Sequence, residues 1–325
     1  MKALFRCISF LFCLVILLGA LSWLFLPKNN TYEDGIGDFL AKGYLGEPEQ
    51  SLDVVFLGDS VPRLAICPPV IWQEEGIPSY VCSGNARSIP YILPDLKQFF
   101  QTQSPRVVVL ETDILFRSFD LNTMFQVMIQ DRFPVFQYHN NWKLYRPAQL
   151  LRRPDYHTVT WEKGYYLWKD IVPWTEGDYM SASEESEPLS PWNIWYFERI
   201  LSLCSSNNAK LFLISAPSPQ NMSSRKHNTL EGLASQYNLP YLDMNEALEE
   251  IGIDWEYDTP DRGDHLNWWG ARKASRYLAH WLMETGLLSN RKGESGYDVW
   301  DSSCNSFFDL VDASFGNTDY TGIEE

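Results

Sequence analysis

Short apolar runs alternate with helical patterns along most of the chain. Five runs are rich in β-branched residues and have the length of buried strands, at 53–58, 79–82, 106–113, 210–217 and 240–245. Helical patterns follow at 68–76, 89–103, near 192–205, near 224–237 and from about 268 to 285. Strands that alternate with helices form parallel sheets that are covered on both faces. The pattern therefore predicts a flavodoxin-like, three-layer α/β/α sandwich with about five parallel strands and with 53–58 near the middle.

The N-terminus has a different pattern. Cys7 to Leu26 form an uncharged apolar run that is long enough to span a bilayer as a helix. A cleaved signal peptide has a shorter apolar core and a small-residue cleavage site, for which this run offers only a weak candidate. Lys2 and Arg6 favour a cytoplasmic N-terminus. We expect an uncleaved, single-pass anchor in the cell membrane, with the rest of the chain outside the cell.

Composition suggests how the chain is divided. Residues 1–28 hold the N-terminus and the anchor, and a linker follows at 29–50. The α/β domain is expected at 51–288, with an aromatic-rich insertion at about 114–190. Residues 289–325 form an acidic tail that we expect to pack onto the body in part.

Charge and cysteine content limit the partners and cofactors. The net charge of −16, without clustered Lys and Arg, argues against nucleic acid. Four cysteines follow the anchor, and Cys67 could pair with Cys82 and Cys204 with Cys304, or all four could be free and buried. Their spacing does not suggest a metal site.

Two stretches carry candidate chemistry. The strand at 53–58 runs into "GDS", so Ser60 either caps the next helix or acts as a nucleophile. His265 lies in "DTPDRGDHLNWWGARK", a turn-rich acidic loop that leads into the last predicted helix. Ligands of open parallel sheets bind outside the carboxyl ends of the strands. Both residues are expected at that edge.

"GDS" and "DHLN" resemble the first and last blocks of the SGNH/GDSL hydrolase family. The similarity extends through 217–228, 239–245 and 263–273, which are similar to membrane-anchored SGNH proteins of Firmicutes. Those proteins resemble the teichoic acid D-alanyl transfer protein and the polysaccharide O-acetyltransferases. The resemblance implies that Ser60 is the nucleophile, that His265 is its general base, and that no cofactor or metal is needed.

The acid that orients the histidine departs from the family pattern. The family's usual position, three residues before the histidine, holds Arg262. A one-residue bulge would bring Asp261 onto the imidazole, whereas Asp264 would reach it only if the loop turned sharply. We favour Asp261 and keep Asp264 as the alternative, with either one able to cap the last helix instead.

The oxyanion hole also departs from the family. The Ser60 amide and Gly84 match the first two donors, and Asn85 could add a side-chain amide. The third donor is usually an asparagine after the third strand, but this strand ends in Glu111, Thr112 and Asp113. Because the loss of one donor costs about two to three orders of magnitude in rate, a slow enzyme is compatible with this site.

The insertion is dense in aromatic residues. They either form a satellite core or a platform on which sugar rings stack. The candidates for such a platform are Trp142, Tyr145, Tyr165, Trp168 and Trp174.

Three functions are compatible with the sequence. The first is an O-acyltransferase that moves an acetyl or similar group onto cell-envelope polysaccharide or teichoic acid through an acyl-Ser60 intermediate. The second is an esterase that removes such groups. The third is a non-catalytic envelope-binding protein. The anchor favours transfer, because the resemblance implies an integral membrane partner that delivers the acyl group.

Overall fold

A five-stranded parallel sheet forms the centre of the protein, as the sequence predicts. The computed structural model describes residues 1–145 and 147–315. The strands are β1 (Val54–Gly58), β2 (Ser79–Ser83), β3 (Val107–Glu111), β4 (Lys210–Ser215) and β5 (Tyr241–Asp243). Their order is β2-β1-β3-β4-β5, and all four pairings are parallel. Strand β1 therefore lies inside the sheet, between β2 and β3.

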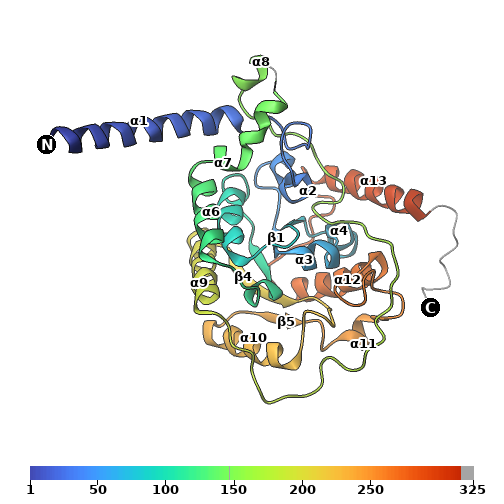
Figure 1. Cartoon of the computed structure of the whole chain (residues 1–325). Helices are drawn as coiled ribbons and strands as arrows, with labels where there is room; N and C mark the ends of the chain where they lie inside the picture. Colours follow the sequence, from blue (N-terminus) through green and yellow to red (C-terminus); the bar gives the residue numbers. More distant parts are fainter. Residues whose placement is uncertain (146, 316–325) are drawn as a thin grey trace.

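Helices cover both faces of the sheet (Figure 1). One face packs against α3 (Ser60–Ala65), α4 (Pro68–Glu75) and α12 (Trp268–Glu284). The other packs against α5 (Ile92–Phe99), α9 (Pro191–Ser206) and α10 (Ser224–Tyr237). The side chains of β1 alternate between the two cores, with Phe56 on the first face and Leu57 on the second. The three-layer α/β/α prediction is confirmed.

Further helices and 3₁₀ turns connect these layers. They are α2 (Phe39–Lys42), α6 (Leu121–Arg132), α7 (Val135–Tyr138), α8 (Pro147–Leu150), α11 (Leu248–Ile251) and the 3₁₀ turns η1 (Gly43–Gly46), η2 (Ile89–Tyr91), η3 (Asp113–Leu115) and η4 (His139–Lys143).

Local sequence explains where the main helices begin and end. Helix α4 starts with Pro68 and ends before Gly76, whose φ of +64° is accessible to glycine at little cost. Helix α12 begins after Asn267, whose side-chain oxygen accepts hydrogen bonds from the amides of Trp269 and Gly270 at 3.1 and 3.3 Å. This cap fixes the start of the helix that follows the His265 loop.

The N-terminal apolar run forms one long helix, α1 (Lys2–Phe25), which is long and apolar enough to cross a membrane. Its last turns contact the body. Ser22 Oγ accepts a hydrogen bond from the Val135 amide at 3.2 Å, and Asn141 Nδ2 donates to the Phe25 carbonyl at 3.1 Å. Most of α1 therefore projects away from the body (Figure 1).

The C-terminal segment forms a helix that the sequence did not predict. Helix α13 (Asp298–Phe315) packs on α4, and the rings of Trp72 and Trp300 stack at a centroid distance of 5.3 Å. Trp72 Nε1 also donates to Asp301 Oδ1 at 2.9 Å. The rest of the predicted acidic tail, 316–325, lies outside the described residues.

The four cysteines that follow the anchor are free and buried. The alternative with two disulfides is therefore wrong. Cys67 and Cys82 lie in the cores on opposite faces of the sheet, which separates their thiols. Burial raises the pKa of both thiols well above the ordinary value.

A buried ion pair joins the linker to the insertion. Lys163 Nζ lies 2.7 Å from Glu47 Oε1, and both side chains are fully buried. The ammonium also lies 4.7 Å from the centre of the Trp300 ring on α13. Burial raises the pKa of Glu47, while Lys163 opposes that rise.

Replacing Lys163 by methionine should lower the free energy of unfolding by about 3–5 kcal/mol, because Glu47 would be left buried without a counter-charge. Lys97→Met is the matched control, since the exposed Lys97–Asp131 pair should contribute at most about 1 kcal/mol. Denaturant unfolding of the detergent-solubilised chain measures both. Equal effects of the two substitutions would contradict the role given to Lys163.

Candidate active site

Ser60 is the first residue of α3, directly after the carboxyl end of β1. The residue that caps this helix is Asp59, whose Oδ1 accepts a hydrogen bond from the Val61 amide at 2.9 Å. Gly58 is the residue required before it, because a Cβ there would lie 2.6 Å from Pro62. The Ser60 hydroxyl is therefore not used as the helix cap.

His265 contacts this hydroxyl although it lies near the other end of the domain's sequence. It lies in the loop that precedes α12, and its Nε2 is 2.8 Å from Ser60 Oγ. The contact joins residues 205 positions apart in the chain. The distance is suitable for direct proton transfer from Ser60 to His265.

Asp261 holds the opposite side of the imidazole. Its Oδ2 lies 2.6 Å from His265 Nδ1, and its Oδ1 accepts the His265 backbone amide at 2.9 Å. Two of the three residues between them fold back in left-handed conformations, with φ of +65° at Arg262 and +84° at Gly263. This turn is the bulge by which Asp261 reaches the imidazole, as expected from the sequence.

Asp264 lies beside the histidine but is bound elsewhere. Its Oδ2 is 3.6 Å from His265 Nδ1, beyond hydrogen-bond distance. Its Oδ1 accepts a hydrogen bond from Asn221 Nδ2 at 2.7 Å. Asp264 therefore acts on His265 through its charge.

The pKa of His265 is raised above its ordinary value of 6.5. Burial alone would lower it, but the hydrogen bond to Asp261 and the charges of Asp264, Asp261 and Asp59 outweigh burial. A histidine whose pKa is raised toward neutrality is suited to accept a proton near neutral pH.

Arg117 is a site residue that the sequence did not reveal. It follows η3, and its Nε contacts the buried carboxylate of Asp59 and lies 3.0 Å from Asp113 Oδ2. Burial raises the pKa of Asp59 to about 6, and the Val61 amide and Arg117 oppose that rise. Arg117 thus stabilises the charged form of the residue that caps α3 beside Ser60.

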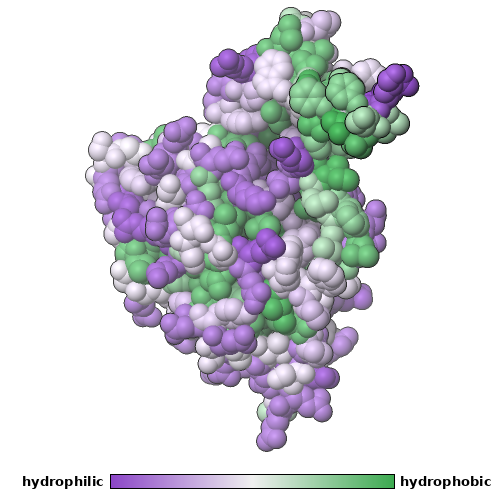
Figure 2. All heavy atoms as spheres, turned by 90° about the vertical axis from the view of Figure 1, so that its left-hand side faces the viewer, coloured by the Kyte–Doolittle hydropathy of each residue, from purple (hydrophilic) through white to green (hydrophobic). Residues whose placement is uncertain are grey.

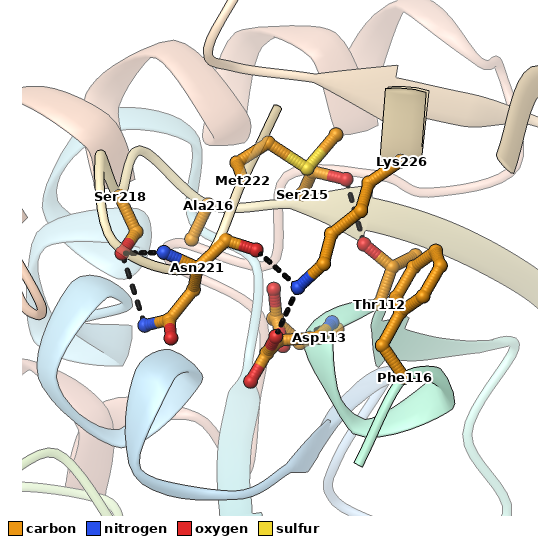
Figure 3. A pocket seen from close by; sticks show the side chains of 10 residues that line it. Thr112, Asp113, Phe116, Ser215, Ala216, Ser218, Asn221, Met222 and Lys226 are labelled. Atoms are coloured by element: carbon orange, nitrogen blue, oxygen red, sulfur yellow. Dashed lines mark hydrogen bonds and ion pairs between the residues drawn. The ribbon is translucent and has the colours of Figure 1, made fainter. Parts of the chain in front are cut away.

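A small cavity lies behind the site, between the carboxyl ends of β3 and β4 (Figure 3). Lys226 Nζ reaches into it, 3.2 Å from Asp113 Oδ1 and 2.7 Å from the Asn221 carbonyl (Figure 3). Burial, followed by the charges of Asp113 and Asp59, raises the pKa of Glu111 well above its usual range. Arg117 and Lys226 are the cations that face this carboxylate cluster.

The two other candidates for the oxyanion hole differ in their surroundings. The β1–β2 register pairs Gly58 with Ser83, so Gly84 follows at the same edge of the sheet as Asp59. Gly84 is buried, and a Cβ there would lie 2.6 Å from Arg87 Nε. Asn85 is exposed. The amide of Ser60 lies in the first turn of α3, where backbone N–H groups have no acceptor within the helix.

The five aromatic candidates are dispersed and do not form one platform. Tyr165 is fully buried in the core between the sheet and α12. Trp142 and Tyr145 lie near the end of α1. The Trp174 amide donates to the Trp255 carbonyl at 3.0 Å. The Trp168 ring lies near the site, with its centroid 6.3 Å from that of His265.

An open depression of about 530 Å³ lies beside Arg117, between the loop after β2 and the start of α6. Its lining is mostly polar and includes Arg87, Ser88, Tyr91, Phe116, Arg117 and Thr123. Because Arg117 contacts Asp59, the depression adjoins the Ser60 loop.

Asp261, Asp264 and His265 also place one potential metal-ligating atom each within 4.8 Å of one another. A divalent ion could bind there only by competing with the 2.6 Å hydrogen bond between His265 Nδ1 and Asp261. The arrangement that orients His265 toward Ser60 and a metal site at these atoms are therefore mutually exclusive.

Chelation by EDTA should leave hydrolysis of a p-nitrophenyl ester by the purified chain unchanged, because proton transfer from Ser60 needs His265 free of metal. The measurement is the initial rate before and after dialysis against the chelator. A loss of activity that Zn²⁺ or Mn²⁺ restores would contradict this expectation.

No family model matches the chain, and no curated protein matches its sequence. Among solved structures, it is similar to a protein from Bacteroides fragilis described as an acylhydrolase, at 12% identity and a TM-score of 0.37, over 77% of this chain and 96% of that one. It is also similar to a GDSL-like lipase from Bacteroides thetaiotaomicron, at 11% identity and a TM-score of 0.35, over 72% and 88% of the two chains. A gut microbial diltiazem-metabolizing enzyme is similar at 12% identity and a TM-score of 0.28, over 74% of this chain and 47% of that one.

Proposed function

We propose that the protein is an SGNH-type serine enzyme that transfers an acyl group through Ser60. The observation that supports this most is the chain of two short contacts, from Ser60 Oγ to His265 Nε2 at 2.8 Å and from His265 Nδ1 to Asp261 at 2.6 Å. This arrangement supplies a nucleophile, a base and a group that orients the base.

The first half of the reaction forms an acyl-serine. Ser60 Oγ attacks the carbonyl carbon of an ester while its proton moves to His265 Nε2. The amides of Ser60 and Gly84 are proposed to stabilise the negative charge on the carbonyl oxygen. The carbon–oxygen bond to the leaving alcohol then breaks, and His265 returns the proton to that alcohol.

The second half regenerates Ser60. A hydroxyl of the acceptor loses its proton to His265 and attacks the acyl-serine. The bond between the acyl carbon and Ser60 Oγ breaks, and His265 Nε2 returns the proton to Oγ, which yields a new ester and free Ser60. We propose a cell-envelope polysaccharide or teichoic acid as the acceptor, an acetyl or similar group as the acyl group, and an integral membrane partner as its source. The polar, open depression beside Arg117 suits a hydrophilic polymer, and α1 suits a protein held at the membrane.

Hydrolysis of esters on the same polymers is the second candidate, because water can replace the acceptor hydroxyl without any change in the protein residues. The exposure of the depression to solvent favours this possibility. A third possibility, a binding protein without catalysis, makes no use of the contact between Ser60 and His265.

The partition of the acyl group between acceptor and water tests the proposal. The full chain in detergent is given p-nitrophenyl acetate, with and without an envelope-derived oligosaccharide, and the acetylated oligosaccharide is measured by mass spectrometry. The transferase predicts acetylated oligosaccharide that is absent with Ser60→Ala. Release of acetate alone would support the esterase. If neither acetate nor acetylated oligosaccharide were formed, both the transferase and the esterase would be overturned.

A further inference from the structure

Helix α6 exposes its apolar side. Leu121, Phe125, Met128 and Ile129 are 60, 57, 59 and 40% exposed, and their spacing places them on one stripe of the helix. Val127 points in the opposite direction and is buried. A surface helix normally presents polar residues to water, so this arrangement indicates a missing apolar or interfacial partner.

The exposed apolar residues continue onto the next elements. Phe136 on α7, Trp142 on η4, and Leu144 and Leu151 on either side of α8 are 46, 59, 52 and 71% exposed. We refer to these four residues and the four on α6 as the α6–α8 face. The face lies on the side of the body from which α1 emerges (Figure 1), and α1 is seen nearly end-on when that side is turned to the viewer (Figure 2).

The contacts of α1 set the depth of this face relative to a bilayer. The uncharged run begins at Cys7, so about 30 Å of hydrocarbon is crossed near the last turn of α1. Ser22 and Phe25 then bind α7 and η4 directly, and Lys28 Nζ lies 5.4 Å from the centre of the Trp23 ring. Trp and Lys at the end of an apolar helix are typical of the bilayer surface. The α6–α8 face thus starts where α1 leaves the membrane.

Charge on this segment complements anionic lipid. Residues 132–153 contain five Lys and Arg and no Asp or Glu, in a chain with a net charge of −16. Lys143, Arg152 and Arg153 are exposed, and Lys143 Nζ lies 5.8 Å from the centre of the Trp142 ring. Basic side chains beside exposed aromatic ones are typical of segments that bind anionic membrane surfaces.

We propose that the α6–α8 face docks on the surface of an anionic lipid bilayer, with α6 lying in the interface beside the point where α1 enters. The body is then held against the membrane by two attachments and does not hang from α1 alone. This docking does not depend on the chemistry proposed for Ser60.

Docking has a consequence for access to the site. Thr123 of α6 forms part of the wall of the depression that contains Arg117. With α6 in the interface, the mouth of the depression lies at the level of the lipid headgroups. A substrate that is attached to lipid would therefore reach it without leaving the membrane surface.

Photo-crosslinking in proteoliposomes tests the docking. The full chain carries p-benzoylphenylalanine in place of Met128, in vesicles of phosphatidylcholine with about 30% phosphatidylglycerol. The control carries it in place of Val299, which is 45% exposed on α13, a helix that lies away from α6 (Figure 1). We expect a lipid adduct, seen by mass spectrometry, in at least about fivefold higher yield at 128 than at 299.

The other outcomes overturn the proposal. Equal lipid adducts at the two positions would show that α6 is not in the interface, and a crosslink between two chains would assign the face to a second copy. The combined substitution of Lys143, Arg152 and Arg153 by glutamine should reduce the adduct at 128 severalfold. An unchanged yield would contradict the attraction to anionic lipid.

Discussion

Replacing Ser60 by alanine is expected to reduce ester hydrolysis and acyl transfer by about three to six orders of magnitude, because the acyl-serine can no longer form. The fold should remain intact, since the cap of α3 is the carboxylate of Asp59. The change in the free energy of unfolding should therefore be below about 1 kcal/mol. Initial rates and a denaturant titration of the same preparation measure the two effects.

His265→Ala is expected to fall to the same low rate, and the double substitution should be little worse than either single one, because the two residues act as a unit. Losses that add in the double variant would show that the two residues act independently. If the activity lost in Ser60→Ala were explained by the fraction of the protein that unfolds, Ser60 would instead be a structural residue.

Asp261→Asn is expected to reduce the rate by about two to four orders of magnitude, because the amide can favour the wrong tautomer of His265. It should also shift the pH profile. His265 acts as a base only when neutral, so activity is lost as the pH falls through its pKa, which in the native chain lies above 6.5. Without the hydrogen bond and charge of Asp261, that pKa falls and the residual activity persists to lower pH.

Asp264→Asn is the matched control for Asp261→Asn. Asp264 raises the pKa of His265 by its charge and forms no hydrogen bond with the ring. We expect a small shift of the acid limb in the same direction and a rate within about tenfold of the native one. If Asp264→Asn were the more damaging substitution, the assignment of Asp261 as the orienting residue would be wrong.

The parts of the fold that the sequence predicted are those with a local pattern. The run "VVFLG" has an uninterrupted apolar sequence because β1 is buried on both faces, and its length marks a strand. Helix α4 carries its own boundaries in Pro68 and Gly76. Such elements can be recognised without knowledge of their neighbours in space.

Helix α13 was missed because its stability depends on a distant partner. Its sequence is acidic, and its apolar residues become significant only when Trp300 stacks on Trp72, far earlier in the chain. The exposed stripe on α6 was missed for a related reason. An apolar pattern in an insertion shows which residues share a side of a helix, and the rest of the fold decides whether that side faces the core or the surroundings.

In the candidate site, too, the sequence predicted the residues with a local pattern and missed those that depend on distant partners. The sequence marked Ser60 and His265 by their places at the end of a strand and before a helix. It favoured Asp261 but kept Asp264 as the alternative, because the choice depends on left-handed backbone at Arg262 and Gly263, and a turn at Arg262 is not encoded by residue type. Arg117 had no signal in the sequence, because its partner Asp59 lies on a different strand-end loop.

The most direct test of the central claim is covalent labelling of Ser60. The full chain is treated with a fluorophosphonate, digested, and mapped by mass spectrometry, alongside Ser60→Ala and His265→Ala. We expect one phosphonylated peptide that contains Ser60, no such label in Ser60→Ala, and labelling slowed by at least about a hundredfold in His265→Ala. An unlabelled Ser60 in the folded native chain, or equal labelling in His265→Ala, would contradict the claim.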